Sequence, residues 1–298
     1  MQAELTLAER ASSDAYANEL QRKEKISAAV RYGVLLVMGL VMLYPMIWLV
    51  GASFKTNAEV FTEIGFWPSR FDFSAYAKGW KTSTEYTFAT YFLNSFLIII
   101  PKVIVTVISC VLVAYAFARF EFWGKKTLFG IMVGTMMLPL IILRLPQYLM
   151  FKEFGWLDSY LPLIVPSAFA TDTFFVFMLV QFLRGIPRDM EEAAQIDGCT
   201  RWQAFWTIEF PLARSGLASA GIFAFLTSWN EYALASQLTR TTASKTMPVG
   251  LMDFTAQFTV DWTGMSAMAV LIIVPALVLT FIVQKHLIAG LTFGGVKG

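Results

Sequence analysis

The segment GIPRDMEEAAQIDGCTRWQAFWTIEFP, residues 185–211, lies between two long apolar runs of the chain. Pro187 suits the start of a helix, because its missing N–H has no helical partner there. The acidic residues that follow fall in the first turns, where the helix dipole favours negative charge. Gly198 suits the left-handed residue that ends such a helix. The segment therefore predicts a short surface helix that ends at a glycine turn.

A second short helix is expected directly after this turn. Thr200 can cap a helix that runs from Arg201 to about Ile208, and Pro211 is expected to end it. The first helix of the predicted hairpin carries a small apolar face, formed by Ala193, Ala194 and Ile196. The second helix carries aromatic side chains that are expected to be exposed or nearly so: Trp202, Phe205 and Trp206. Two interpretations fit: an amphipathic hairpin anchored among lipid headgroups, or a surface helix that docks into a groove on a partner.

The composition around this segment is that of a membrane protein. The chain has 298 residues, of which 57% are hydrophobic and 15% charged, and its mean hydropathy is +0.60. Soluble domains are about 25% charged. A net charge of +2 argues against nucleic-acid binding, and one histidine, His286, argues against a histidine-rich metal site or a histidine-based triad. The sequence contains no phosphate-binding loop, so energy for any ATP-driven work must come from another subunit.

Six apolar runs are long enough to cross a bilayer, which takes about 20 residues. We therefore predict an all-α polytopic membrane protein with six transmembrane helices. Its expected parts are an N-terminal segment (1–32), a membrane domain (33–284) that includes the hairpin, and a C-terminal tail (285–298). The expected spans are 33–54, 94–118, 127–143, 162–183, 215–238 and 262–284.

The orientation follows from the lysines and arginines. They are denser on the side that holds both termini, most clearly at 22–31 and 119–126. By the positive-inside rule this side is cytoplasmic. The chain is therefore expected to be N-in and C-in, with the hairpin at 185–211 in the cytoplasm.

The hairpin also carries a recognisable spacing. Glu192-Ala193-Ala194, then Gly198, Ile208 and Pro211 resemble the EAA loop of ATP-binding-cassette importer permeases. Three further stretches are similar to the carbohydrate-uptake branch and its MalG-like subunit: 115–119 (YAFAR), 229–231 (WNE) and the glycine-rich tail 290–298. Two residues depart from the usual pattern, Cys199 in place of alanine and Phe210 in place of leucine.

The resemblance implies a type I importer in the bacterial plasma (inner) membrane. Its expected partners are a second, MalF-like permease, a dimer of cytoplasmic ATPases, and a periplasmic or extracellular solute-binding protein. ATP and Mg would bind the ATPases, so this chain would be non-catalytic and bind no cofactor or metal. The EAA helix would dock into an ATPase cleft and the tail would insert between the ATPases. The residues so implied are Glu191, Glu192, Ala193, Ala194, Asp197 and Gly198 for coupling, and Gly294, Gly295 and Lys297 for the tail.

Three ionisable residues interrupt the expected spans, and such residues are functional candidates. Lys102 and Asp172 lie at similar depth, so they can form a structural pair; alternatively Lys102 faces the pore and meets an anionic sugar such as a uronate oligosaccharide. Trp229, Asn230 and Glu231 suit a sugar pathway or gate, or an interhelical polar clamp. The residues alone do not identify the sugar.

Other classes of protein explain the sequence less well. An ion-coupled secondary sugar carrier, with Lys102, Asp172 and Glu231 as a relay, would transport without an ATPase. A membrane enzyme would need acidic or histidine residues converging at one interface, which the scattered carboxylates do not supply. An interaction scaffold would leave the EAA spacing unexplained.

Overall fold

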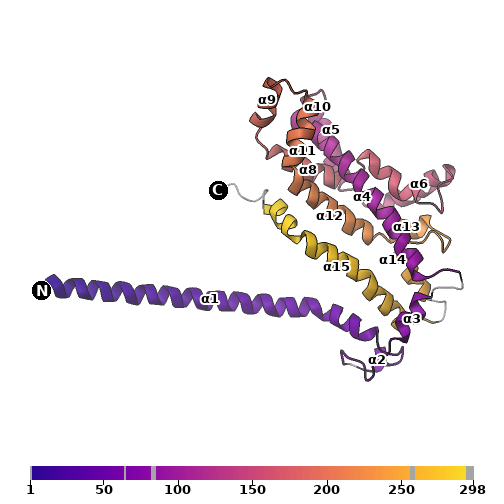
Figure 1. Ribbon diagram of the computed structural model, residues 1–298, viewed down its shortest axis with the longest axis horizontal. Helices are drawn as coiled ribbons and strands as arrows, with labels where there is room; N and C mark the ends of the chain where they lie inside the picture. The colour runs from indigo at the N-terminus through magenta and orange to yellow at the C-terminus, as the bar shows by residue number, and fades with distance from the viewer. Residues whose placement is uncertain (1, 64, 82–84, 256–258, 293–298) are drawn as a thin grey trace. The chain divides into compact units, whose positions relative to one another are not determined.

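The chain is almost entirely helical in a computed structural model that describes residues 2–63, 65–81, 85–255 and 259–292, with side chains described between residues 21 and 283. Its one extended feature among these residues is an isolated antiparallel bridge between Thr255 and Val260. The chain divides into two compact units, Met1–Asp72 and Phe73–Gly298. We call them unit 1 and unit 2 (Figure 1).

Unit 1 is dominated by one long helix, α1 (Gln2–Ala52), followed by the short α2 (Glu59–Thr62). The expected N-terminal segment is therefore continuous with the first apolar run. The part Gln21–Ala52 is long and apolar enough to span a membrane, and none of its most apolar window is buried within the chain. After the helix, Lys55 Nζ donates to the carbonyls of Gly65 (2.6 Å) and Glu63 (3.2 Å). The apolar surface of α1 thus requires lipid or another subunit to cover it.

Unit 2 contains the remaining helices. Its core lies where α4, α8 and α12 pack together around Cys110, Leu179 and Ala220, and α15 packs against α12. The bounds are α3 (Ser74–Trp80), α4 (Phe88–Arg119), α5 (Lys125–Thr135), α6 (Leu140–Glu153), α7 (Leu161–Ile164), η1 (Val165–Phe169), α8 (Thr173–Arg184), α9 (Asp189–Ile196), α10 (Arg201–Ala204), η2 (Phe205–Glu209), α11 (Phe210–Leu212), α12 (Arg214–Trp229), α13 (Ala233–Leu238), α14 (Met247–Gly250), η3 (Leu251–Phe254) and α15 (Trp262–Thr292).

Three of the expected spans are not single straight helices. The third run divides into α5 and α6, which meet at 96°, because Pro139 caps α6 in an extended conformation. The fourth breaks at Ala170, which has a positive φ of 52°. The fifth ends at Trp229 and resumes in α13. Within the described residues, four helical segments can span a membrane, or up to six if each bent pair counts as one span.

Figure 1 shows where the interrupted connections of unit 2 lie. The helices α9 and α10 stand at one end of the unit, close to the start of α5, whereas α13 and α14 lie toward the other end. We call the first of these the loop end and the second the opposite end. Each end carries one group of the polar side chains singled out in the sequence.

Candidate functional site

The hairpin at the loop end has the local structure that its sequence predicts. Gly198 follows α9 with φ +92°, and the N–H of Cys199 donates back to the carbonyl of Ala194 (2.9 Å). Thr200 caps α10 in a full capping box with Gln203, which satisfies two backbone N–H groups at once. The predicted turn and the predicted second helix are both present.

The end of this second helix differs from the prediction. Pro211 does not end it: the chain continues through the π-helical η2 into α11, and it bends by 74° where α12 begins. Pro211 lies directly after the π-helical turn and shortly before the bend, and both π-bulges and prolines are common causes of helix kinks. The widened π turn and the bend direct the chain from the hairpin into the core helix α12.

The aromatic side chains of the hairpin divide between the core and the surface. Phe205 was expected near the surface but is fully buried, with its ring 4.7 Å from that of Tyr115 on α4. Trp202 and Trp206 are exposed. Trp202 also stacks on Phe205, at 5.8 Å between ring centroids. The hairpin is thus packed against α4 through Phe205, and its two tryptophans remain at the surface.

A buried ionic cluster joins the hairpin to α4 beneath these rings. Arg119, the last residue of α4, lies 2.5 Å from the carboxylate of Glu209 (Nη2 to Oε1) and 3.6 Å from that of Glu191 (Nε to Oε2). The side chains of Arg119 and Glu209 are only 4% and 1% exposed. We call Arg119, Glu191 and Glu209 the anchor cluster. A charge this deeply buried is costly unless paired, so the cluster holds the hairpin to α4.

Hydrogen bonds extend the anchor cluster along the first helix of the hairpin and to the loop before it. The hydroxyl of Tyr115 donates to Glu191 Oε1 at 3.0 Å, and Gln195 donates to the same oxygen at 3.4 Å. Arg119 also donates to the carbonyl of Ile186 (3.1 Å). The carboxylate of Glu191 is therefore satisfied inside the chain.

This geometry separates the residues that were grouped as coupling candidates. Glu191 and Ala194 face inward and are buried, whereas Glu192, Ala193, Asp197 and Gly198 are exposed. Ile196, predicted to share an apolar face with the alanines, is 86% exposed. The outward surface, which we call the docking face, consists of Met190, Glu192, Ala193, Ile196 and Asp197. Glu191 belongs to the anchor cluster, because a helix turns by about 100° per residue and places neighbours on different faces.

A second group of polar side chains lines a recess toward the opposite end. Lys102 from α4 and Glu231 from the turn after α12 both lie on this recess, together with three hydroxyl side chains, Ser95, Ser228 and Thr246. Sequence reasoning had selected Lys102 and Glu231 separately, and the structure brings them to one site. We call it the polar recess.

One of the two alternatives for Lys102 was a structural pair with Asp172. Among the described residues, no ion pair within 4 Å includes Lys102. Glu231 is held elsewhere: its carboxylate lies 3.6 Å from Arg144 and accepts from the N–H of Leu234 at 2.8 Å. Lys102 is therefore the cation of the polar recess that has no carboxylate in contact.

The Trp-Asn-Glu segment serves mainly to end α12. Trp229 is buried, donates its indole N–H to the carbonyl of Ile272 (3.2 Å) and stacks on Phe225 at 5.1 Å. Asn230 is exposed and donates to the carbonyl of Leu226 at 2.8 Å. The sequence leaves two roles open for Trp229, a pathway or gate and an interhelical clamp. Its burial and its hydrogen bond to α15 correspond to the clamp. Of the three residues, Glu231 alone lines the polar recess.

Two further predictions concern other parts of the chain. The tail residues Gly294, Gly295 and Lys297 lie outside the described residues. Within the described part of the chain, no group of three or more His, Cys, Asp or Glu side chains is arranged to hold a metal ion.

A rigidly anchored surface helix beside a bundle of apolar helices is the arrangement of a subunit that works with others. Residues 109–292, more than half of the chain, match the family described as the binding-protein-dependent transport system inner membrane component. The chain belongs to this family. It is a multi-pass permease subunit of the inner membrane, and as such it is not an enzyme.

Relatives of this permease cover almost its whole length. It is 34% identical to the sulfoquinovosyl glycerol transport system permease protein SmoH of Agrobacterium fabrum, over 89% of this chain and 91% of that protein. It is 35% identical to the trehalose transport system permease protein SugB of Mycobacterium tuberculosis, over 88% and 95%. A solved bacterial ABC transporter involved in the import of the acidic polysaccharide alginate matches with a TM-score of 0.75 and 25% identity, over 89% of this chain and 97% of that one.

Family membership confirms the resemblance seen in the sequence. It implies a partner permease, an ATPase and a substrate-binding protein in general terms. It also excludes the ion-coupled secondary carrier, because members of the family work with a binding protein.

Two members of the anchor cluster were not among the candidate site residues. Arg119 entered only the orientation argument and the resemblance at 115–119, and Glu209 was not singled out. A signal was present: Glu209 is the one charged residue in the apolar stretch 205–213, and Arg119 is the first charge after Lys102. Opposite charges bordering apolar segments suggest a pair, but the sequence does not say which partners meet.

Proposed function

We propose that this permease is one half of the pathway of an ATP-driven importer for oligosaccharides or glycosides, with its loop end in the cytoplasm. The relatives named for sulfoquinovosyl glycerol, trehalose and diacetylchitobiose support a carbohydrate substrate. The lysines and arginines concentrated at the loop end support the N-in, C-in orientation. In this proposal the second, MalF-like permease completes the pathway, and an ATPase dimer that holds ATP and Mg docks below.

The observation that carries this proposal is the contrast between the two faces of α9. The inner face is held to α4 by Glu191, whereas the docking face exposes Glu192 and Ile196. An exposed apolar side chain beside a carboxylate suits a groove on another protein. Because the helix is anchored on its inner side, a partner that moves the docking face also moves α4 and α12. Such rigid coupling transmits a domain motion with few residues.

The test is reconstitution with the ATPase and the second permease. Ile196→Glu with Glu192→Lys is expected to abolish most binding-protein-stimulated ATP hydrolysis, because both changes lie on the docking face. The matched control is Glu153→Lys, an exposed glutamate at the end of α6. Full stimulated hydrolysis by the docking-face variant, with folding unchanged, would overturn the coupling role.

The polar recess supports a finer proposal about the substrate. Lys102 has no carboxylate in contact, and three hydroxyl groups line the same recess. The recess has a volume of only about 20 Å³, about that of one water, so its groups suit contact with the carboxylate or sulfonate of a sugar in the adjoining pathway, such as a uronate oligosaccharide, rather than enclosure of the sugar. The relatives named for alginate and sulfoquinovosyl glycerol agree with this preference.

Lys102→Gln tests this substrate preference. Transport of an acidic oligosaccharide is expected to fall at least tenfold relative to that of a neutral one of equal length, and Lys152→Gln, an exposed lysine on α6, is the control. Equal loss for both sugars would show that Lys102 has a structural role.

The C-terminal tail completes the proposal. By resemblance, Gly294, Gly295 and Lys297 insert between the two ATPase subunits. Truncation after residue 290 is expected to weaken ATPase assembly without changing the fold of unit 2. Unchanged co-purification of the ATPase would contradict this role.

A further inference from the structure

A second recess at the loop end is not used by the docking face. It lies where the turn between α4 and α5 meets the end of α8, and its volume is about 620 Å³. A smaller hollow of about 410 Å³ adjoins it and shares Glu121, Lys125 and Arg184 with it. We call the combined site the basic recess, lined by Glu121, Lys125, Lys126, Phe129, Arg184 and Arg188.

The charges of the basic recess do not balance. Glu121 is its one carboxylate, and it is paired with Lys125 at 2.8 Å. The hydrogen bond from Lys125 lowers the pKa of Glu121, so this pair stays ionised. Lys125 also donates to the carbonyl of Phe120 at 2.7 Å. Glu121 is thus already in contact with Lys125, and it forms no ion pair within 4 Å with Lys126 or Arg184.

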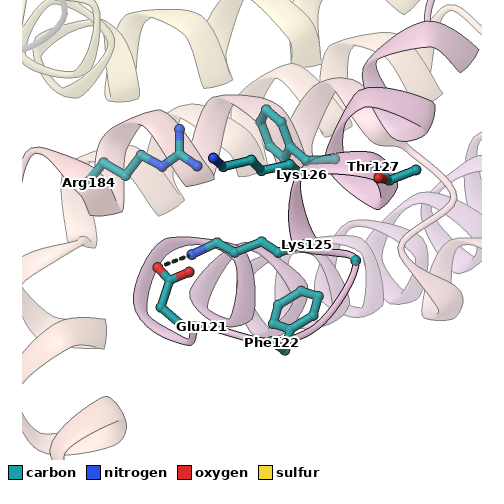
Figure 2. Close-up of a pocket in the computed structure, with 8 residues that line it drawn as sticks. Glu121, Phe122, Lys125, Lys126, Thr127 and Arg184 are labelled. Atoms are coloured by element: carbon teal, nitrogen blue, oxygen red, sulfur yellow. Dashed lines mark hydrogen bonds and ion pairs between the residues drawn. The ribbon is translucent and has the colours of Figure 1, made fainter.

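These two cations converge on the same space. Figure 2 shows Lys126 from α5 and Arg184 from α8 pointing toward one another, away from the Glu121–Lys125 pair. Among the described residues, neither has a carboxylate within 4 Å. Arg184 is positioned by the ring of Phe129, 5.2 Å from its guanidinium carbon, which is a favourable cation–π distance. Two like charges that face each other across a hollow favour an anion between them.

The surroundings place the basic recess at the membrane surface. Trp123, in the turn beside it, is 98% exposed, and tryptophan is enriched at the level of lipid headgroups. Leu128 and Ile131 on the same helix are exposed and apolar. Five residues of helix separate Lys126 from Ile131, which is about 7.5 Å at 1.5 Å per residue. The cations therefore lie about one headgroup layer away from surface that faces hydrocarbon.

We propose that the basic recess binds the phosphate of an anionic phospholipid from the cytoplasmic leaflet. Its cytoplasmic location rests on the proposed function. The phosphate lies between Lys126 and Arg184, and the acyl chains follow the exposed apolar surface of α5. Basic pockets between membrane helices on the cytoplasmic side are suited to such headgroups. A bound lipid would tie α5 to α8 near the start of the hairpin.

The test is native mass spectrometry of the purified full chain in detergent, titrated with phosphatidylglycerol or phosphatidylcholine of identical acyl chains. The wild type is expected to retain phosphatidylglycerol preferentially. Lys126→Gln with Arg184→Gln is expected to weaken that binding on the order of tenfold or more, since each basic residue near an anionic surface contributes substantially. The matched control, Lys78→Gln with Lys152→Gln, removes two exposed lysines outside the basic recess and is expected to bind as the wild type does.

Three outcomes would overturn the proposal. The first is a wild type with no preference for phosphatidylglycerol, and the second is a loss of phosphatidylglycerol binding in the control equal to that in the double variant. The third is displacement of the lipid by inorganic phosphate at equal concentration, which would indicate a site for free phosphate. If the double variant does not fold, Lys126→Gln alone, on an exposed lysine, provides the same comparison. The measurement needs no ATPase. If the wild type shows no preference for phosphatidylglycerol while the docking-face variant loses stimulated hydrolysis as expected, only the lipid site is refuted. If the preference depends on Lys126 and Arg184 while the docking-face variant keeps full stimulated hydrolysis, only the proposed coupling is refuted.

Discussion

Removal of Arg119 is the sharpest test of how the hairpin is held. Arg119 is one cation between two carboxylates, Glu209 at 2.5 Å and Glu191 at 3.6 Å. Arg119→Met leaves Glu209 without its counter-ion where its side chain is 1% exposed and its second oxygen already has no hydrogen-bond partner. Breaking a buried pair from one side costs about 3–5 kcal/mol. We expect the unfolding temperature of the detergent-solubilised chain to fall by roughly 6–10 °C, at about 2 °C per kcal/mol for a chain of this size.

Glu209→Gln should cost much less than Arg119→Met. It retains an acceptor for Arg119 and leaves Glu191 to balance the charge, so its expected cost is about 1 kcal/mol. The double variant Arg119→Met, Glu209→Met removes both charges. Its loss of unfolding free energy is expected to be smaller than the sum of the two single losses by at least about 2 kcal/mol, which a double-mutant cycle measures. Arg144→Met is the matched control. Its ion pair with Glu231 is longer, at 3.6 Å, and partly exposed, so its expected cost is below about 1 kcal/mol.

A local measurement complements the unfolding temperature. The chain has two cysteines, Cys199 on the hairpin and the buried Cys110 in the core. Release of the hairpin should therefore increase the rate of thiol labelling at Cys199 before Cys110 reacts. Two results would refute the anchor cluster. One is a loss of unfolding free energy that agrees within about 0.5 kcal/mol between Arg119→Met and Glu209→Gln. The other is an unchanged rate of thiol labelling at Cys199.

Three further predictions concern other parts of the fold. Gly198→Ala should lower stimulated ATP hydrolysis and cost about 1 kcal/mol, since φ +92° strains any residue with a Cβ; unchanged stability and hydrolysis would show that the turn relaxes. Gly250→Ala should cost about 1–3 kcal/mol, measured as a lower unfolding temperature, because its Cβ would lie 2.2 Å from the buried ring of Tyr91; a cost near zero would show that the ring moves. Burial opposes ionisation of Asp158, but hydrogen bonds from Ser244, Thr241 and Arg240 outweigh it and lower its pKa to about 2. The ionised Asp158 therefore stabilises the fold by about 1 kcal/mol after allowance for solvent screening. This stabilisation is present above the pKa of the unfolded chain and is lost as the pH falls through about 2. Asp158→Asn should remove it at neutral pH, and a variant as stable as the wild type at pH 7 would contradict the prediction.

The local features of the hairpin could be predicted because their causes lie within a few residues. The left-handed glycine at Gly198 and the capping box at Thr200 are set by backbone and side-chain chemistry inside one or two helical turns. The same holds for the apolar runs, since about 20 apolar residues can be accommodated only in a membrane. The breaks within these runs were missed. Pro139 marks the 96° bend between α5 and α6, but proline is also tolerated inside membrane helices, so its presence alone did not predict a break.

The burial of each side chain was decided by the tertiary structure. Glu191 and Glu192 are equivalent in composition, yet one bonds to Tyr115, 76 positions earlier, while the other is exposed. Lys102 and Glu231 likewise line one recess only because α4 and α12 pack together. The sequence by itself determined the class of protein and the position of the coupling loop, since both follow from local pattern. Which face of that loop holds it to the membrane domain, and which is left for a partner, depends on contacts between distant segments, and these exist only in the folded chain.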